Sequence, residues 1–249
     1  MQQELVGKCA LVTGSSGGLG KHIALALARA GAAVAINYRT NRAAAEALAA
    51  RIEAEGGRAA VLGGDVTEPA DCRRLVDETV ARLGAIDILV NNAGEYSPAL
   101  CRDHTDVEFE RIVRSTVGGT FYCSMRALEY MRPRRWGRIV NLGAAGAERA
   151  AGRRNIGPHL AGKSAVISLT RTLAVEEGPF GVTVNAICPG VIEDREISRE
   201  EAAHLRDRWA PVGRPGTHED IDDAVLFLVS PRASFINGAV LQVTGGYGL

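Results

Sequence analysis

The chain has 249 residues, of which 46% are hydrophobic, 23% charged and 5% aromatic, and such a chain can bury one sizeable core in a single domain over residues 1–249. Lysine plus arginine and aspartate plus glutamate balance at 29 each, so the total charge gives no reason to expect a nucleic-acid or membrane partner. The start MQQELVGKCALVTG has no signal-peptide pattern, and no apolar run approaches the roughly 20 residues of a membrane span. We therefore expect a cytoplasmic protein.

The cysteines are scattered along the chain and none belongs to a C-x-x-C motif. Such spacing is typical of reduced thiols in apolar positions rather than of a disulfide framework or a zinc site. We expect no metal. The five positions are Cys9, Cys72, Cys101, Cys123 and Cys188.

Short apolar runs alternate along the chain with longer stretches, such as 18–31 and 73–84, that carry apolar residues at helical spacing. Runs that are apolar along their whole length are buried on both faces, which predicts a parallel sheet with helices on each side. The fold class is therefore α/β. The runs are residues 9–14, 33–38, 59–64, 86–92, 137–143, 182–187 and 239–245.

One long irregular stretch interrupts this alternation. Residues 188–216 read CPGVIEDREISREEAAHLRDRWAPVGRPG, which is charged and bounded by prolines. Long loops in compact domains are commonly functional lids. We expect a lid at about 191–216.

A glycine-rich turn, TGSSGGLG at residues 13–20, follows the first strand and opens the first helix. Its glycines permit a tight turn and let the backbone approach a pyrophosphate, whose charge the helix N-terminus stabilises. Such a turn can also serve only to pack a strand against a helix. The ends of other strands distinguish these interpretations.

The second strand ends INYRT, with no Asp or Glu where a carboxylate would bind a free ribose 2′-hydroxyl. Arg39 follows instead and can pair with a 2′-phosphate. This favours NADP(H), with NAD(H) as the alternative. The third strand ends GGDV and the fourth ends NNAG, at the sheet edge where ligands of such sheets bind.

Together, the T-G-x-x-x-G-x-G turn, the D-V, the N-N-A-G and the segment LTRTLAVEEGPFGVTVNAICPGVI resemble the short-chain dehydrogenase/reductase family, especially its 3-oxoacyl-(acyl-carrier-protein) reductases. The resemblance runs from about Gly7 to the C-terminal GGY. It implies a Rossmann-like, doubly wound, seven-stranded parallel sheet, an NAD(P)-dependent oxidoreductase, and a homotetramer or homodimer. With Asn37 and Arg39 added from the second strand, the cofactor-binding positions it implies are Thr13, Gly14, Ser16, Leu19, Gly20, Asp65, Val66, Asn92, Ala93, Gly94, Lys163, Pro189, Gly190 and Ile192.

The family's catalytic residues are Asn, Ser, Tyr and Lys, and three of them are replaced here. HLAGK places His159 at the tyrosine position and keeps Lys163, while GRIVNLGAAG places Ala144 at the serine position. VRSTVGGTFYC places Thr116 at the asparagine position. Asp194 stands where the family has threonine, and its charge near the expected diphosphate weakens the expected cofactor binding.

His159 and Lys163 are four residues apart, so on a helix they share one face. The Lys163 ammonium should lower the pKa of His159 below about 6.5 and keep the imidazole neutral at pH 7. A neutral imidazole acts as a base or hydrogen-bond donor more readily than as a strong acid. Three interpretations stay open: a lapsed site, an unusual redox reaction, and a non-redox lyase, isomerase or cyclase with His159 as base.

Arginines surround this segment and suggest partners. Arg149, Arg153 and Arg154 fall near the expected mouth of the site, and Arg134, Arg135 and Arg138 precede the fifth strand. Arg135 matches a position that the family uses to dock acyl carrier protein, but Phe180 stands at the other; a solvated surface is the alternative. The substrate is expected to be a small carbonyl, alcohol or acyl thioester. A second class of function is a nucleotide-binding partner subunit of a catalytically complete relative.

Overall fold

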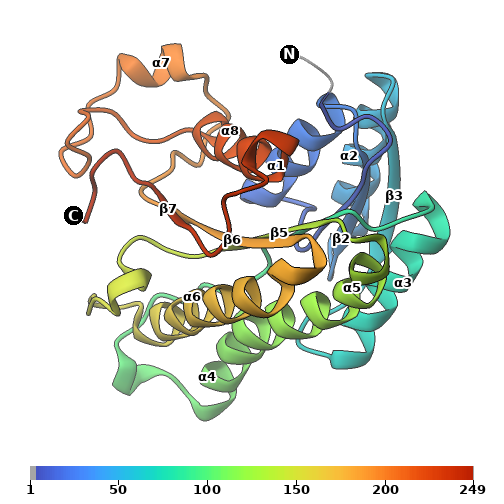
Figure 1. Ribbon diagram of the computed structural model, residues 1–249. Coiled ribbons are helices and arrows are strands. Elements are labelled where there is room, and N and C mark those ends of the chain that lie inside the picture. Colours follow the sequence, from blue (N-terminus) through green and yellow to red (C-terminus); the bar gives the residue numbers. More distant parts are fainter. Residues whose placement is uncertain (1–3, 249) are drawn as a thin grey trace.

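The computed structural model describes residues 4–248 and contains one parallel sheet (Figure 1). Its strand order is β3-β2-β1-β4-β5-β6-β7, with every pairing parallel. All seven predicted runs form strands, so the doubly wound α/β prediction is confirmed. The strands are β1 Cys9–Val12, β2 Ala33–Tyr38, β3 Arg58–Gly63, β4 Ile88–Asn91, β5 Gly137–Leu142, β6 Val182–Pro189 and β7 Val240–Val243.

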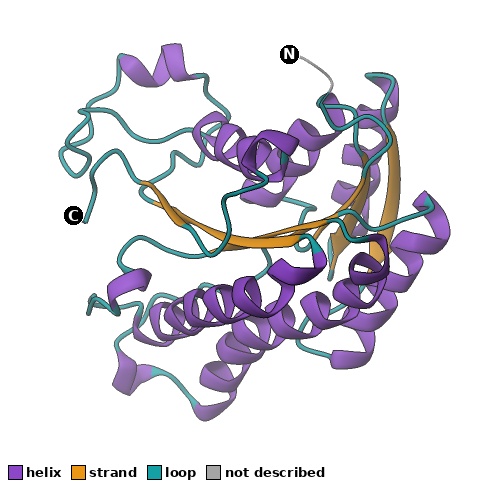
Figure 2. Cartoon of the chain, in the orientation of Figure 1, coloured by secondary structure: helices purple, strands orange, loops and turns teal. Residues whose placement is uncertain are grey.

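Helices cover both faces of the sheet (Figure 2). On one face lie α1 (Gly18–Arg29), α2 (Arg42–Ala54) and α8 (His218–Val229), whose apolar residues share one core cluster. On the other lie α3 (Pro69–Leu83), α4 (Asp106–Val113), α5 (Gly119–Arg134) and α6 (Gly157–Glu177). The shorter helical segments are the π-helical η2 Arg114–Gly118, the 3-10 turns η1 Cys101–Asp103, η3 Ala147–Arg149, η4 Gly178–Phe180 and η5 Pro231–Ala233, and α7 Arg199–Ala203.

The central strands explain why the runs are apolar throughout. Along β1, Ala10 and Val12 join the core on the α1 face, whereas Cys9 and Leu11 join the core on the α3 face. Successive residues of a strand point to opposite faces, so a strand covered on both sides needs apolar residues at every position. The continuous apolar pattern therefore indicates that helices cover both faces of the sheet.

The long irregular segment between β6 and α8 has its two ends tied together. Ile192 and Gly216 form an isolated parallel bridge, and Glu193 N donates to Gly216 O at 2.9 Å. Between these ends the chain makes an excursion that contains α7. The lid expected at about 191–216 falls on this segment, and its closing over a ligand stays a prediction.

The remaining expectations concern cysteines, metals and membranes. Four cysteines are buried free thiols, but Cys101 is exposed because it lies in the surface turn η1. Between residues 4 and 248, no group of three or more His, Cys, Asp or Glu side chains is arranged to hold a metal ion. Within the same range, no helix has the length and apolarity needed to cross a bilayer.

Candidate active site

Two cavities lie side by side at the carboxyl edge of the sheet. The first, of about 440 Å³, is bounded by the ends of β1, β2 and β4, and the second, of about 660 Å³, by the ends of β5 and β6 and the start of α6. Leu19, Asn92 and Gly94 line both. The cavities therefore form one continuous cleft at the edge where doubly wound sheets bind ligands.

The glycine-rich turn forms one wall of the first cavity. Gly14 has a φ of 62°, and a Cβ at Gly20 would lie 2.5 Å from Asn92 Nδ2 and 2.6 Å from Gly14 O, so neither position suits a larger residue. Gly17 caps α1 without a side-chain hydrogen bond, and the first turn carries no acidic residue. The amide groups at the start of this 12-residue helix are thus available to an anion. This turn fits a cofactor diphosphate.

Thr13 and Asn92 hold the turn in place from beneath. Thr13 Oγ1 accepts from the backbone N–H groups of Asn92 and Ala93, each at 3.0 Å, and Asn92 Nδ2 donates to Thr13 O at 2.9 Å. Thr13 and Gly20 are buried and line neither cavity. Their place is therefore in the support of the turn, although the resemblance counts them among the cofactor-binding positions.

Asn37 has a similar supporting role. Its Oδ1 accepts from Gly14 N at 2.9 Å, and its Nδ2 donates to Leu62 O at 3.3 Å and Gly64 O at 3.1 Å. The side chain is 2% exposed although the residue borders the first cavity. Its polar atoms are occupied by the backbone, so it fixes the turn relative to the ends of β2 and β3.

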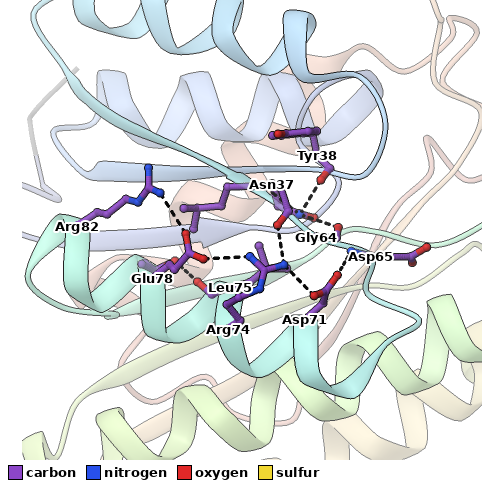
Figure 3. A network of polar contacts seen from close by, with 12 residues as sticks. Asn37, Tyr38, Gly64, Asp65, Asp71, Arg74, Leu75, Glu78 and Arg82 are labelled. Carbon is purple, nitrogen blue, oxygen red and sulfur yellow. Dashed lines mark hydrogen bonds and ion pairs between the residues drawn. The ribbon is translucent and has the colours of Figure 1, made fainter.

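A polar network continues from Asn37 into α3 (Figure 3). Asp71 accepts from Asp65 N at 2.8 Å, and Arg74 donates to Asp71 at 2.7 Å and to Gly63 O at 3.0 Å. These contacts come from the first two turns of α3 and hold the loop that carries Asp65. The floor of the first cavity is therefore built by side chains bonded to backbone groups.

The acidic residue Glu95 lies beside Arg39, and the sequence did not predict this contact. Arg39 Nη1 is 3.5 Å from Glu95 Oε2, Arg111 Nε donates to the same carboxylate, and Arg39 and Glu95 both line the first cavity. The end of β2 holds no carboxylate, as expected, but the segment after β4 brings one next to the guanidinium. The only sequence signal was that Glu95 directly follows the NNAG motif.

His159 and Lys163 both line the second cavity from the first turns of α6. Lys163 is 5% exposed, its Nζ donates to Leu142 O at 2.6 Å, and burial lowers its pKa to about 8. His159 lies with its Nδ1 3.1 Å from Glu95 O. Burial lowers the pKa of its imidazole, and the nearby Lys163 charge lowers it further.

The contact with Glu95 decides which nitrogen of His159 carries the proton. A carbonyl oxygen only accepts hydrogen bonds, so Nδ1 donates and the neutral ring has an unprotonated Nε2. No residue between 4 and 248 bonds to Nε2. From the sequence, His159 could act as a base or as a hydrogen-bond donor. Its Nδ1–H donates to Glu95 O, so only Nε2, an acceptor, is left to contact a ligand.

Comparisons with known proteins identify the family of this chain. The family model described as Enoyl-(Acyl carrier protein) reductase matches residues 14–248. The 3-oxoacyl-[acyl-carrier-protein] reductase FabG of Staphylococcus epidermidis is 35% identical over 243 residues, which cover 96% of this chain and 98% of that protein. The chain belongs to the short-chain dehydrogenase/reductase family.

Solved structures are also similar to this chain. A short chain dehydrogenase from Burkholderia cenocepacia in complex with NADP is 34% identical, with a TM-score of 0.88 and 98% of each chain covered. A blue fluorescent protein from a metagenomic library in complex with NADPH is 36% identical, with a TM-score of 0.87 and 99% and 100% coverage. The predicted family and its Rossmann-like fold are confirmed.

Two positions that the resemblance assigns to the family's catalytic residues offer little to a ligand. Ala144 lines the second cavity without a polar side-chain atom. Thr116 lies in the π-helical turn η2, is 1% exposed and lines neither cavity. A Cβ at Gly94 would lie 3.3 Å from Thr116 Oγ1 and 3.5 Å from Lys163 Nζ, so Thr116 sits behind Gly94. Its Oγ1 has no hydrogen-bond partner among the residues that the structure describes.

The other positions implied by the resemblance divide between the cavities. Asp194 is exposed and lines neither cavity, so the expected charge beside the diphosphate lies outside the cleft walls. Residues that the sequence did not single out as site residues also contribute, namely Ser115 in the first cavity and Tyr96 and Tyr247 in the second. Of the predicted set, the first cavity holds Gly14, Ser16, Leu19, Asn37, Arg39, Asp65, Val66, Asn92, Ala93 and Gly94, and the second holds Leu19, Asn92, Gly94, Lys163, Pro189, Gly190 and Ile192.

The arginines expected just before β5 lie toward the amino-terminal edge of the sheet, which is the wrong edge for docking a partner near the site. Arg135 precedes the start of β5 and donates to Pro179 O at 2.9 Å, whereas the cavities lie at the carboxyl end of that strand. Arg138 does not precede β5 but lies within it, 4% exposed, over the Trp136 ring. Arg134 pairs with Asp87 at the same amino-terminal edge. The sequence showed that these arginines lie near the fifth strand, but it did not show at which end of the strand, relative to the cleft, their side chains lie.

Proposed function

We propose that this protein is an NADP(H)-dependent oxidoreductase that interconverts an alcohol and a carbonyl group on a small substrate, with His159 in place of the family's tyrosine. The observation that carries the proposal is the free Nε2 of His159, which shares the second cavity with the buried Lys163 beside the glycine-lined first cavity. The missing serine and tyrosine make the site non-standard.

The cleft fits the cofactor. The glycine-rich turn and the start of α1 would hold the diphosphate, and Arg39 would pair with the 2′-phosphate. The Burkholderia and metagenomic relatives, which hold NADP and NADPH, support this preference; NAD(H) is the alternative. When bound, the oxidised cofactor supplies a hydride acceptor.

The chain's own residues handle the proton and the charge. In alcohol oxidation, Nε2 of His159 would accept the O–H proton of the substrate as the carbonyl forms. The Lys163 ammonium stabilises the negative charge that develops on the oxygen. Reduction would need imidazolium, which the lowered pKa of His159 disfavours at neutral pH. The site therefore suits alcohol oxidation better than reduction.

Acyl thioesters stay within the proposed substrates because of the name of the S. epidermidis relative. Acyl carrier protein remains an alternative partner, although docking through Arg135 near the site loses its support from the position of that residue. The homotetramer or homodimer stays a prediction from the resemblance, which gel filtration with light scattering tests.

The experiment measures NADP⁺ reduction by the purified protein with a panel of alcohols, hydroxy acids and 3-hydroxyacyl thioesters, with NADPH binding titrated by fluorescence. His159→Gln should lower kcat by on the order of 10²-fold or more while NADPH affinity is kept. Glu46→Gln, in an exposed pair with Arg42 on α2, serves as the control.

Two outcomes would contradict the proposal. Wild-type activity untouched by His159→Gln would show that the imidazole takes no proton. Tight NADPH binding without turnover of any panel member would favour the second candidate, a nucleotide-binding partner subunit, which the missing polar atom at Ala144 supports.

A further inference from the structure

The second cavity has walls whose charged side chains are all cationic. Among the residues described, Arg153, Arg154 and Lys163 line it, and no Asp or Glu does. The first cavity differs, because Asp65 and Glu95 line it together with Arg39. A concave site with charges of one sign concentrates ligands of the opposite sign. The second cavity therefore favours an anion.

Arg153 is held in place without a carboxylate partner. Its Nη2 donates to Ala145 O at 3.2 Å, and its guanidinium lies 4.8 Å from the centre of the Tyr247 ring. No ion pair within residues 4–248 involves Arg153 or Arg154. Because Ala145 directly follows Ala144 at the end of β5, the guanidinium is fixed close to the reacting edge with donors left for a ligand.

The loop that carries Arg153 has an unfavourable backbone. Ala150 has a φ of 53°, in the left-handed region that residues with a Cβ rarely adopt, and Asn155 has a φ of 67°, a conformation that asparagine tolerates better than most residues. Asn155 O accepts from Ala99 N at 2.9 Å, which fixes the far end of the loop. Strain of this kind persists where the surroundings impose it, and it concentrates at ligand sites.

We propose that the substrate carries an anionic oxygen group, carboxylate or phosphate, which Arg153 binds as a two-pronged donor while Arg154 adds charge at the rim. The phosphates of the cofactor have separate partners in the glycine-rich turn and Arg39, so they do not account for Arg153. The inference rests on the proposed function, because it names the substrate class of the same cleft. The reacting hydroxyl lies at His159 and the anion at Arg153.

The test compares matched neutral and anionic probes. Hydroxy acids of two to six carbons are assayed for NADP⁺ reduction beside their methyl esters, and glycerol 3-phosphate beside glycerol. One anionic class should exceed its neutral partner at least about tenfold in kcat/KM, as expected for charge-assisted hydrogen bonds; the acid and phosphate arms tell the two classes apart. A neutral probe that matches or exceeds its anionic partner in both arms would overturn the proposal.

Variants assign the preference to Arg153. Arg153→Gln should remove the preference for the anionic probes, mainly by raising their KM. Arg232→Gln, which changes an exposed arginine in η5 outside the lining of both cavities, should keep the preference. Should circular dichroism show Arg153→Gln misfolded, Arg153→Lys replaces it, keeping the charge but losing the fork. If the preference for anionic probes is kept when the Arg153 guanidinium is lost, the proposal is overturned.

A second readout separates this inference from the proposed function. The same probes are tested by thermal shift with NADP⁺ in excess, which needs no turnover. Stabilisation by the anionic probes that is lost in Arg153→Gln and kept in Arg232→Gln supports the anion site even if no alcohol is oxidised. Equal shifts from anionic and neutral probes overturn it even if the protein is an active dehydrogenase.

Discussion

The first and second cavities of the cleft differ in how their polar groups are used. Thr13, Asn37 and Asn92 around the first cavity bond to the backbone and hold its walls. In the second cavity, Ala144 offers no polar atom and His159 presents an accepting nitrogen. The walls of the first cavity are thus fixed to the sheet by hydrogen bonds. His159 and Ala144 in the second cavity can be replaced without disturbing those bonds. This shows why fold alone does not fix the reaction.

The largest expected effect comes from making the second cavity match the family pattern. His159→Tyr with Ala144→Ser places a phenol and a hydroxyl beside Lys163, which lowers the phenol pKa. NADPH-dependent ketone reduction should rise by on the order of 10²-fold or more, with smaller gains from each single change.

The single variants are the controls for this restoration. The same double change should abolish alcohol oxidation that depends on His159. A double variant that folds and binds NADPH but reduces no ketone in a stopped-flow assay would show that the start of α6 does not hold the family geometry.

The next effect addresses the first cavity alone. Arg39→Asp should weaken NADPH binding by roughly 10- to 100-fold, because it replaces a charge-assisted partner of the 2′-phosphate with a like charge. Fluorescence titration with NADPH and NADH measures the change in preference. Arg42→Asp, which alters the same charge in an exposed pair with Glu46, should leave the preference intact. Equal NADPH and NADH affinities in the wild type would contradict the role of Arg39.

A smaller effect concerns pH and belongs to the second cavity. The pKa of His159 is lowered from its usual 6.5, so its base form is already present at neutral pH. The pKa of Lys163 is about 8, and its charge is lost above that pH. Alcohol oxidation should therefore rise as pH increases through the pKa of His159 and fall by roughly tenfold between pH 8 and pH 9.5. A kcat/KM profile that keeps rising to pH 10 would exclude a need for the Lys163 ammonium.

The smallest effect tests the Glu95 carboxylate in the first cavity. Glu95→Gln keeps the backbone carbonyl that orients His159 but frees Arg39, so NADPH affinity should rise about two- to fivefold, as expected for a half-exposed pair. Glu46→Gln, in the exposed pair with Arg42, is the matched control. Weaker NADPH binding in Glu95→Gln would mean that Glu95 positions Arg39 for the phosphate instead of competing with it.

The sequence by itself determined the elements and the nucleotide turn. Apolar runs gave all seven strands, and the glycine spacing at residues 13–20 gave the turn against α1, because these patterns depend on neighbours in the chain. The spacing of His159 and Lys163 placed both side chains on one helical face for the same reason. These features could be predicted because their geometry is local.

Only the tertiary structure decided how distant segments meet. The strand order β2-β1-β4-β5 brings Glu95 beside both Arg39 and His159, which selects the imidazole tautomer and puts a carboxylate in the first cavity. The direction of β5 puts Arg135 at the edge away from the cleft, and the folding of the loop after β5 places Arg153 and Arg154 in the lining of the second cavity. Such contacts depend on strand order, register and loop shape, which residue type and spacing do not specify.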